Sequence, residues 1–380
     1  TIRHRERLKS AIKQSIQNAE DMANCRVNSV WLSFSTPDLQ SVNSVGEVKI
    51  KHDIVQAKDV VAALTQAKNK HLTDDLYLMH YAQQGIALDG NAEMIDDAIG
   101  MQASDLMVLY HLMMMPVKGR QNLQQLLQEC DVSIDQMLFD AVSTAEYGLL
   151  PEEKYHGVCL IDIGASTTSI CVYREDKLIY THCFAEGGHH ATLDISMLLD
   201  VTIAEAENMK KSQANVDRHG IDSSQFFTIK RSQHDDEKTI NMLELLEVTE
   251  ARYISILGHI KKELDKEGLS EFLQQGYVIT GGGAEMRGLL PLAKKIFANK
   301  VNKVNQHSAI SAYTQYGDDD KLRTIAAMIG ERKYQTAFGT LLYSQSEAFH
   351  HSEKSSPDSL QVKPMREKLK TVNKFFGKFF

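Results

Sequence analysis

The stretch between Val158 and Tyr173 constrains the fold of this chain more than any other. Short apolar runs at 158–161 and 170–173 predict two buried strands, and they flank an acid, a glycine and several hydroxyl residues. Small residues in such a turn let a phosphate approach backbone N–H groups, and Asp162 is suited to hold a hydrated Mg²⁺ beside it. The stretch therefore predicts a phosphate-binding hairpin, with an ordinary hairpin of a sheet as the alternative.

A second glycine-rich turn lies nearer the C-terminus. Residues 276–280 predict a buried strand, and Gly281, Gly282 and Gly283 follow it directly, before a helix predicted over 289–297. Three consecutive glycines are costly to order, so they favour a ligand that lies against the backbone at a helix N-terminus. A plain strand-to-helix turn is the alternative. The acid and the spacing of a dinucleotide fingerprint are missing, which argues against a Rossmann fold.

Helical spacing predicts further elements on both sides of the first hairpin. Helices are expected over 203–212, where Glu207 and Lys210 lie one turn apart, and over 243–267. The apolar face of the longer helix is expected to contain Leu246, Ala251, Ile254, Leu257, Ile260 and Leu264. Toward the N-terminus, a helix is expected over 3–25 and a strand over 27–35. A small inserted α/β module should then contain short strands at 76–81, 86–88 and 106–114.

Composition limits the class of protein. The chain has 380 residues, 43% of them apolar and 24% charged, which is typical of a soluble globular protein with two or more domains. Its five cysteines are scattered without a CxxC pair, and Cys159, Cys171 and Cys183 lie in apolar runs, so we expect these three to be reduced, buried thiols of a cytosolic protein. A net charge of −8 argues against nucleic acid as the main partner. The histidine pairs at 189–190 and 350–351 have no further ligands at metal-binding spacing.

The C-terminal residues 365–380 combine an apolar stripe with five basic side chains and one acid. This pattern predicts a short amphipathic helix that attaches reversibly to an anionic membrane surface. The side chains expected to bind the membrane are Leu369, Val372, Lys374, Phe375, Phe376, Phe379 and Phe380. A polar linker at 344–364 favours a tethered anchor over the alternative, a helix that docks on the protein itself or on a partner.

Three features occur in an informative order: the Asp-Ile-Gly hairpin at 162–164, the Glu207/Lys210 pair, and the Thr-Gly-Gly-Gly loop at 280–283. This order resembles the second half of the actin, Hsp70 and sugar-kinase nucleotide fold. With the inserted module and the C-terminal stripe, the whole chain resembles the FtsA family of actin-like bacterial cell-division proteins. The resemblance implies an α/β, actin-like (ribonuclease-H-like) fold of two halves, with an inserted small α/β subdomain and a C-terminal amphipathic helix.

The resemblance also implies a division into subdomains. Residues 1–36 and 116–157 would form a partial subdomain 1A, 37–115 the inserted subdomain 1C, 158–198 and 268–343 subdomain 2A with the return to 1A, 199–267 subdomain 2B, 344–364 a flexible linker, and 365–380 the membrane-targeting helix.

The family binds ATP with Mg²⁺ between its two halves, self-assembles, and binds the C-terminal tail of FtsZ through subdomain 2B. It tethers FtsZ filaments to the cytoplasmic face of the inner membrane at the division septum, and later division proteins bind subdomain 1C. Carried over by motif, the implied ATP-binding residues fall into three groups. Asp162, Gly164 and Thr167 belong to the second phosphate loop, with Asp162 holding Mg²⁺ through water; Glu207 and Lys210 contact ribose and adenine; Gly281, Gly282, Gly283 and Met286 line the adenosine. No catalytic residue is evident, so the chain is at most a weak ATPase.

Two departures from the family pattern affect the nucleotide. Ala165 and Ser166 replace glycines of the hairpin, where side chains would crowd the γ-phosphate if positive φ were needed, and Ser169 replaces an acid. The family's first phosphate hairpin precedes the helix that here begins near Thr1, so we expect this chain as given to bind nucleotide weakly. Two alternatives are a PilM-like pilus-assembly ATP-binding protein, disfavoured by the amphipathic stripe, and a sugar-kinase-type phosphotransferase, disfavoured because no catalytic base is found.

Overall fold

The computed structural model describes residues 4–219, 224–230, 237–304 and 331–346, which fall into two compact units. The larger unit contains the residues up to Val42, the segment Leu72–His80 and the chain from His111 to Tyr343. The other contains Asn43–His71 and Tyr81–Tyr110. The amphipathic helix expected at 365–380, with all its membrane-binding side chains, lies outside the described residues.

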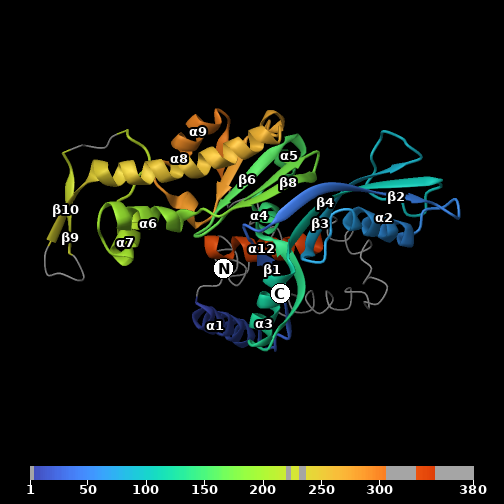
Figure 1. Cartoon of the computed structure of the whole chain (residues 1–380), viewed down its shortest axis with the longest axis horizontal. Helices are drawn as coiled ribbons and strands as arrows, with labels where there is room; N and C mark the ends of the chain where they lie inside the picture. Colours follow the sequence, from blue (N-terminus) through green and yellow to red (C-terminus); the bar gives the residue numbers. More distant parts are fainter. Residues whose placement is uncertain (1–3, 220–223, 231–236, 305–330, 347–380) are drawn as a thin grey trace, which may run out of the picture. The chain divides into compact units, whose positions relative to one another are not determined.

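A five-stranded sheet forms the centre of the larger unit (Figure 1). Its strands, in spatial order, are β12 (Val301–Lys303), β11 (Tyr277–Thr280), β6 (Val158–Ile163), β7 (Thr168–Arg174) and β8 (Lys177–Phe184). β6, β7 and β8 form an antiparallel meander, whereas β11 runs parallel to β6 and β12 runs parallel to β11. β6 and β7 are buried on both faces, as expected of strands covered by helices on two sides.

Alternation along β6 and β7 determines which side chains reach which helices. Cys159, Ile161 and Ile163 pack in the apolar cluster that includes α8 (Met242–Lys266) and α9 (Leu289–Phe297). On the opposite face, the Cys171 thiol donates to the carbonyl of Ala141 in α4 (Asp140–Gly148), with Sγ and O 3.3 Å apart. Asp162 lies two residues from Leu160, which pairs with Cys171, and therefore faces α4.

Three helices and a short hairpin follow the meander. They are α6 (Gly188–Leu198), α7 (Ile203–Ser212), β9 (Phe226–Lys230), β10 (Glu237–Asn241) and α8. α7 begins with a capping box, in which the Thr202 side chain accepts from the Glu205 N–H and the Glu205 carboxylate accepts from the Thr202 N–H. The expected bounds of α7, 203–212, are confirmed.

The apolar face expected for α8 is only partly correct. Leu246, Leu257, Ile260 and Leu264 are buried, but Ala251 and Ile254 are exposed. The face turned to the core instead includes two residues with hydroxyl groups, Thr249 and Tyr253, and is completed by Leu245 and Ile256. The expectation was wrong because it ranked residues by polarity, whereas a hydroxyl group can be buried once it finds a backbone acceptor.

Besides the five-stranded sheet, the larger unit contains the parallel pair β1 (Ser29–Phe34) and β5 (Ser133–Phe139). Its other helices among the described residues are α1 (Arg5–Ala23), α3 (Val117–Gln128), α4, α5 (Pro151–His156) and α12 (Gln335–Gln345). α12 crosses α4 so closely that a Cβ on Gly339 would lie 2.7 Å from the carbonyl carbon of Ser143. Glycine at this position therefore sets the distance between the two helices.

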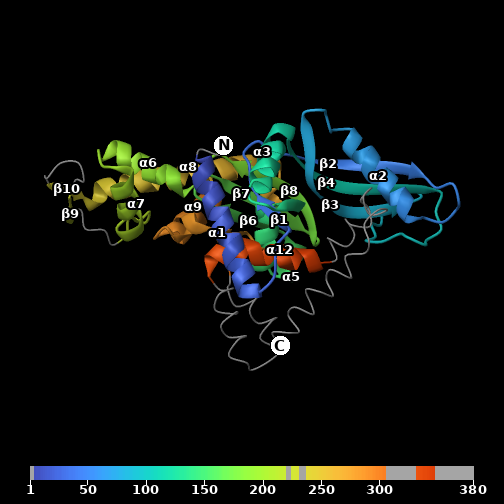
Figure 2. The ribbon, with the colours of Figure 1, turned by 90° about the horizontal axis from the view of Figure 1, so that it is seen from below.

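The second unit contains α2 (Ala57–Asn69) and the greater part of a three-stranded sheet, whose strands in spatial order are β2 (Gln40–Lys49), β4 (Asp105–Pro116) and β3 (Leu76–Leu88). Figure 2 shows α2 along one face of these strands, and a Cβ on Gly46 of β2 would lie 2.5 Å from the carbonyl carbon of Ala63 in α2. β3 is continuous, whereas two short strands were expected over this range. Backbone pairing with β4 carries the strand through the polar residues Gln83 and Gln84, which interrupt the apolar pattern.

Candidate functional site

A cavity of about 740 Å³ lies among the hairpin turn, the start of α6, α7, α8 and the glycine loop. Its lining is Gly164, Ala165, Gly188, His189, Ile203, Ala204, Glu207, Lys210, Lys211, Ala214, Tyr253, Gly282, Gly283, Glu285, Met286 and Arg287. Six of the nine residues predicted to bind nucleotide are in this list. Asp162, Thr167 and Gly281 are not. The three sequence features therefore converge on one cavity, although parts of two of them face elsewhere.

The three glycines of the loop have different reasons to be glycine. Gly281 has a φ of +90°, and a Cβ there would lie 2.5 Å from the carbonyl oxygen of Ile163. A Cβ on Gly283 would also meet Ile163, 3.0 Å from its carbonyl oxygen and closer still to its side chain. A Cβ on Gly282 would meet nothing within 4 Å. Packing against β6 therefore requires two of the glycines, whereas Gly282, which lines the cavity together with Gly283, has open space at its Cβ position.

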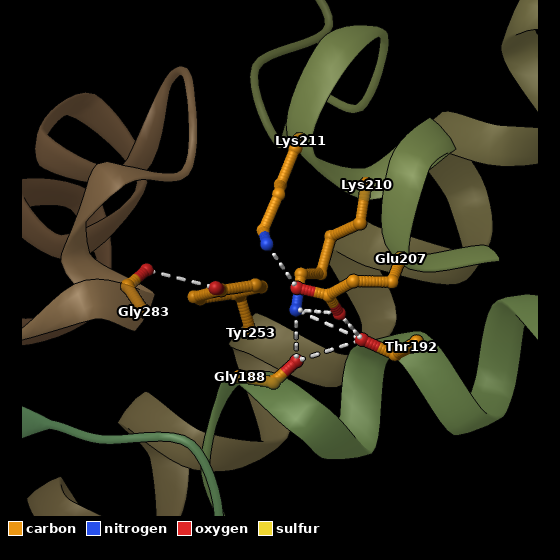
Figure 3. Close-up of polar contacts among 7 residues, drawn as sticks. All are labelled: Gly188, Thr192, Glu207, Lys210, Lys211, Tyr253 and Gly283. Carbon is orange, nitrogen blue, oxygen red and sulfur yellow. Dashed lines mark hydrogen bonds and ion pairs between the residues drawn. The ribbon is translucent and has the colours of Figure 1, made fainter. Parts of the chain in front are cut away.

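A compact polar cluster joins α6 and α7 on one wall of the cavity (Figure 3). The Lys210 ammonium donates to Glu207 Oε2 at 2.7 Å, to Thr192 Oγ1 at 2.8 Å and to the Gly188 carbonyl at 3.0 Å. Thr192 Oγ1 donates to the same Glu207 oxygen at 2.5 Å, and Lys211 Nζ lies 3.1 Å from the other oxygen, Oε1. Burial of this carboxyl raises its pKa, but the hydrogen bonds from Lys210, Thr192 and Lys211 prevail and lower the pKa of Glu207 to about 2. Glu207 is therefore ionised at neutral pH.

Tyr253 connects α8 to the glycine loop. Its hydroxyl donates to the carbonyl oxygen of Gly283 at 2.8 Å, and the residue is 1% exposed. Burial raises the pKa of Tyr253 well above its usual value, so the hydroxyl remains a donor. The helix thereby fixes one end of the loop that borders the cavity.

The phosphate-loop hairpin is bonded to the start of α6. The N–H of Gly188 donates to the carbonyl of Gly164 at 2.9 Å, and the N–H of His189 donates to that of Ala165 at 2.7 Å. Neither Ala165 nor Ser166 is among the described non-glycine residues with positive φ. The backbone therefore does not require positive φ at Ala165 or Ser166, which was the condition for their side chains to crowd the γ-phosphate.

A second carboxylate, that of Asp140, lies beside Asp162 and was not predicted from the sequence. Ser169 is the cross-strand partner of Asp162, and it hydrogen-bonds the carboxylate of Asp140 at the start of α4. One turn further along α4, Thr144 Oγ1 donates to Asp162 Oδ2 at 3.2 Å. Burial and, second, the charge of Asp140 raise the pKa of Asp162 to about 7, and burial raises that of Asp140. Asp140 thus supplies an acid beside the strand position where the sequence has Ser169.

Within the described residues, no group of three histidine, cysteine or acidic side chains is arranged to hold a metal ion. A cation beside Asp162 and Asp140 would therefore need water molecules to complete its coordination, as hydrated Mg²⁺ does. Thr167 lies away from the cavity lining, with its Oγ1 3.3 Å from the hydroxyl oxygen of Ser35. In the part of the chain that the structure covers, no helix has the length and apolarity needed to span a bilayer.

Comparison with known proteins gives consistent results along the chain. The family model described as cell division protein FtsA matches residues 159–327, and that of the SHS2 domain inserted in FtsA matches residues 37–114. The cell division protein FtsA of Buchnera aphidicola subsp. Acyrthosiphon pisum is 27% identical over 378 residues, which cover 98% of this chain and 86% of the relative. FtsA of Pseudomonas aeruginosa is 27% identical over 365 residues, with 95% and 84% covered.

The structural comparison supports the same fold. A chain of the PilM-PilN type IV pilus biogenesis complex aligns with a TM-score of 0.56 and 14% identity, covering 92% of this chain and 86% of that one. At this identity the likeness concerns the fold alone, and it confirms the expected actin-like α/β architecture. The two family models, on separate parts of the chain, give the more specific assignment. The chain is therefore an FtsA-like protein of the actin-like ATPase superfamily.

Proposed function

We propose that this protein binds ATP with Mg²⁺ in the cavity between the hairpin, α7 and the glycine loop, and that it assembles into filaments that tether FtsZ to the membrane. The observation that carries the nucleotide part is the convergence of Glu207, Lys210 and Gly282 on one cavity of about 740 Å³. That volume lies in the range of small-molecule sites. An ionised carboxylate in the wall provides an acceptor for sugar hydroxyl groups.

Each part of the site has a role in this proposal. Glu207 accepts ribose hydroxyls, and Met286 with the glycine loop covers the adenosine. Gly164 and Thr167 belong to the turn that faces the phosphates. Asp162, with Asp140 nearby, holds the water molecules of a magnesium ion, which neutralises phosphate charge when it is bound. No described residue of the cavity lining is placed as an evident general base, so we propose at most slow ATP hydrolysis.

The partners follow from the family rather than from this cavity. We propose that the region 199–267 binds the C-terminal tail of FtsZ, that the chain associates with itself, and that the inserted region 37–115 binds later division proteins. The C-terminal residues 365–380 would attach the assembly to the cytoplasmic face of the inner membrane at the septum. A PilM-like role in pilus assembly is the second candidate, because a PilM–PilN structure shares the fold. The match of residues 37–114 to the domain inserted in FtsA favours the division role.

Calorimetry with ATP and Mg²⁺ tests the nucleotide site. Glu207→Gln should weaken binding, since the neutral amide is a poorer acceptor and the pairing with Lys210 is lost. Glu244→Gln, an exposed carboxyl of α8 outside the cavity lining, is the matched control and should bind as the unmodified chain does. Equal binding by both variants, or no binding by the unmodified chain, would contradict the proposal.

Co-sedimentation with anionic vesicles tests the tether. The full chain should bring FtsZ down with the vesicles, and a chain ending at Pro364 should not. The double variant Phe376→Ser, Phe379→Ser keeps the basic side chains and removes two apolar contacts, so it should bind vesicles more weakly than the full chain. Unchanged vesicle binding after the truncation would rule out this membrane anchor.

A further inference from the structure

Two adjacent lysines of α7 line the cavity, but their surroundings differ sharply. The Lys210 side chain is 14% exposed, whereas that of Lys211 is 72% exposed. Lys210 is held by three oxygen atoms, and the ion pair of Lys211 joins a single oxygen of Glu207. The two lysines therefore have different capacities to bind anything else.

The donors of Lys210 are fully used. An ammonium group has three N–H donors, and those of Lys210 match three acceptors in number: Glu207 Oε2, Thr192 Oγ1 and the Gly188 carbonyl. A ligand could gain a hydrogen bond from Lys210 only if one of these bonds broke. For Thr192 and Gly188, which are buried, breaking it would leave an acceptor without its charged partner, which is costly. Lys210 is therefore suited to hold α6 and α7 together.

The same contacts give the two oxygens of Glu207 different roles. Oε2 accepts from both Thr192 and Lys210, so its position is fixed from the protein side. Among the described residues, Oε1 has the long, exposed side chain of Lys211 as its single ion-pair partner, at 3.1 Å. Exposed pairs of this kind contribute little to stability and exchange readily with solvent. Oε1 is thus the oxygen that a ligand can reach, and Lys211 is the cation that can move to accommodate it.

We propose that Lys211, and not Lys210, is the cation of α7 that contacts the bound nucleotide, and that Lys210 is a positioning residue that fixes Glu207 with Oε1 toward the cavity. The ligand part of this proposal rests on the proposed function, whereas the role of Lys210 does not. A ligand hydroxyl that binds Oε1 displaces the Lys211 ammonium, which remains within reach of an acceptor on the same ligand. This differs from the role that the resemblance to the family implied for Lys210, namely contact with ribose and adenine.

The test compares matched variants of the two lysines in the full chain, with ATP and Mg²⁺ as the probe. Lys210→Met should lower the melting temperature of the ligand-free protein by about 4 °C, because Glu207 and Thr192 lose a buried charged partner. Lys211→Met should leave it within about 2 °C of the unmodified chain, since an exposed pair is lost. Lys211→Met should nevertheless raise the Kd for ATP about 10-fold, the effect of one lost charge-assisted hydrogen bond.

Conservative replacements separate charge from geometry. Lys211→Arg should restore most of the ATP affinity, because an exposed guanidinium keeps the charge and the donors. Lys210→Arg should not restore the melting temperature, since its planar fork does not fit three acceptors arranged around an ammonium. Unchanged ATP affinity of Lys211→Met, or equal melting temperatures of Lys210→Met and Lys211→Met, would overturn the proposal. Failure of the unmodified chain to bind ATP would overturn the proposed function and the role of Lys211, and the melting temperatures would still decide that of Lys210.

Discussion

Alanine substitution at each glycine of the loop 281–283 separates the demands of packing from those of ligand access. At Gly281 a side chain would need the left-handed φ of +90°, which costs a non-glycine residue about 1–2 kcal/mol. Its Cβ would also overlap the backbone of Ile163, with only 2.5 Å to the carbonyl oxygen and 2.8 Å to the carbonyl carbon. Overpacking of this kind typically adds about 1–3 kcal/mol, so Gly281→Ala should destabilise the fold by about 3 kcal/mol.

Alanine at the other two glycines should destabilise the fold less than at Gly281, and Gly283→Ala should cost more than Gly282→Ala. Gly283 does not have positive φ, and its nearest obstacle is the side chain of Ile163, so Gly283→Ala should cost about 1–2 kcal/mol. Gly282 also lacks positive φ and has open space at its Cβ. Gly282→Ala should therefore leave stability unchanged or raise it by up to about 1 kcal/mol, because the unfolded chain loses conformational freedom.

Urea unfolding of the full chain without nucleotide measures these differences, and calorimetry with ATP and Mg²⁺ measures access to the cavity. Gly282→Ala should weaken ATP binding at full stability, since Gly282 lines the cavity and an added methyl group would take up open space beside the loop. If Gly282→Ala destabilised the protein as much as Gly281→Ala, Gly282 would have to pack against neighbouring residues instead of having open space at its Cβ position. Wild-type affinity in a fully stable Gly282→Ala variant would show that the ligand does not lie against this glycine.

Three further predictions concern pH and helix propensity. Burial lowers the pKa of His80 and of His111 to about 3, the latter also through the charge of His80, so the folded state excludes protons that the unfolded chain binds near pH 6.5. The contribution of these two histidines to the free energy of unfolding should be fully present above pH 6.5 and should fall by about 1.4 kcal/mol per pH unit for each histidine between pH 6.5 and 3. Urea unfolding at pH 7.5 and pH 5 measures this difference, and equal free energies of unfolding at the two pH values would contradict the prediction. The raised pKa of Asp162, about 7, gives the opposite sign: its contribution is present near pH 4 and lost as pH rises through 7. Asp162→Asn should therefore be more stable than the unmodified chain at pH 8, by at most about 4 kcal/mol, and not at pH 4; a difference independent of pH would refute the reasoning. Gly258→Ala, in α8 with open space at its Cβ, should raise the melting temperature, corresponding to about 1 kcal/mol of helix propensity, and a decrease would show a contact that the packing does not reveal.

Local rules explain which parts of the site could be predicted from the sequence. The hairpin strands, α7 and the turn at Gly281 each depend on residues close together in the chain. For α7, the Thr202/Glu205 capping box marks the start of the helix without reference to any other element. The location of the cavity could therefore be predicted from the sequence, because three of its walls are short local motifs.

The remaining residues of the site come from elements whose positions depend on tertiary packing. Thr192 and Tyr253 lie on helices whose polar residues gave no separate signal, and Asp140 reaches Asp162 only because β5 leads directly into α4. Thr249 and Tyr253 were passed over as members of the buried face because of their hydroxyl groups. Each hydroxyl is satisfied by a backbone carbonyl: Thr249 donates to Asn215 at 2.8 Å, and Tyr253 donates to Gly283. Such acceptors become visible only when distant segments are placed side by side.

Gly188 links the separate parts of the site into one hydrogen-bonded unit. Its N–H donates to the hairpin carbonyl of Gly164, and its own carbonyl accepts from Lys210, which in turn holds Glu207. A displacement of the hairpin would therefore move the start of α6 and, through the hydrogen bonds of Lys210, disturb the fixed oxygen of Glu207. The carboxylate that we propose binds the sugar and the turn that we propose faces the phosphates are connected through a single residue, Gly188, so their ligand contacts should form together rather than independently.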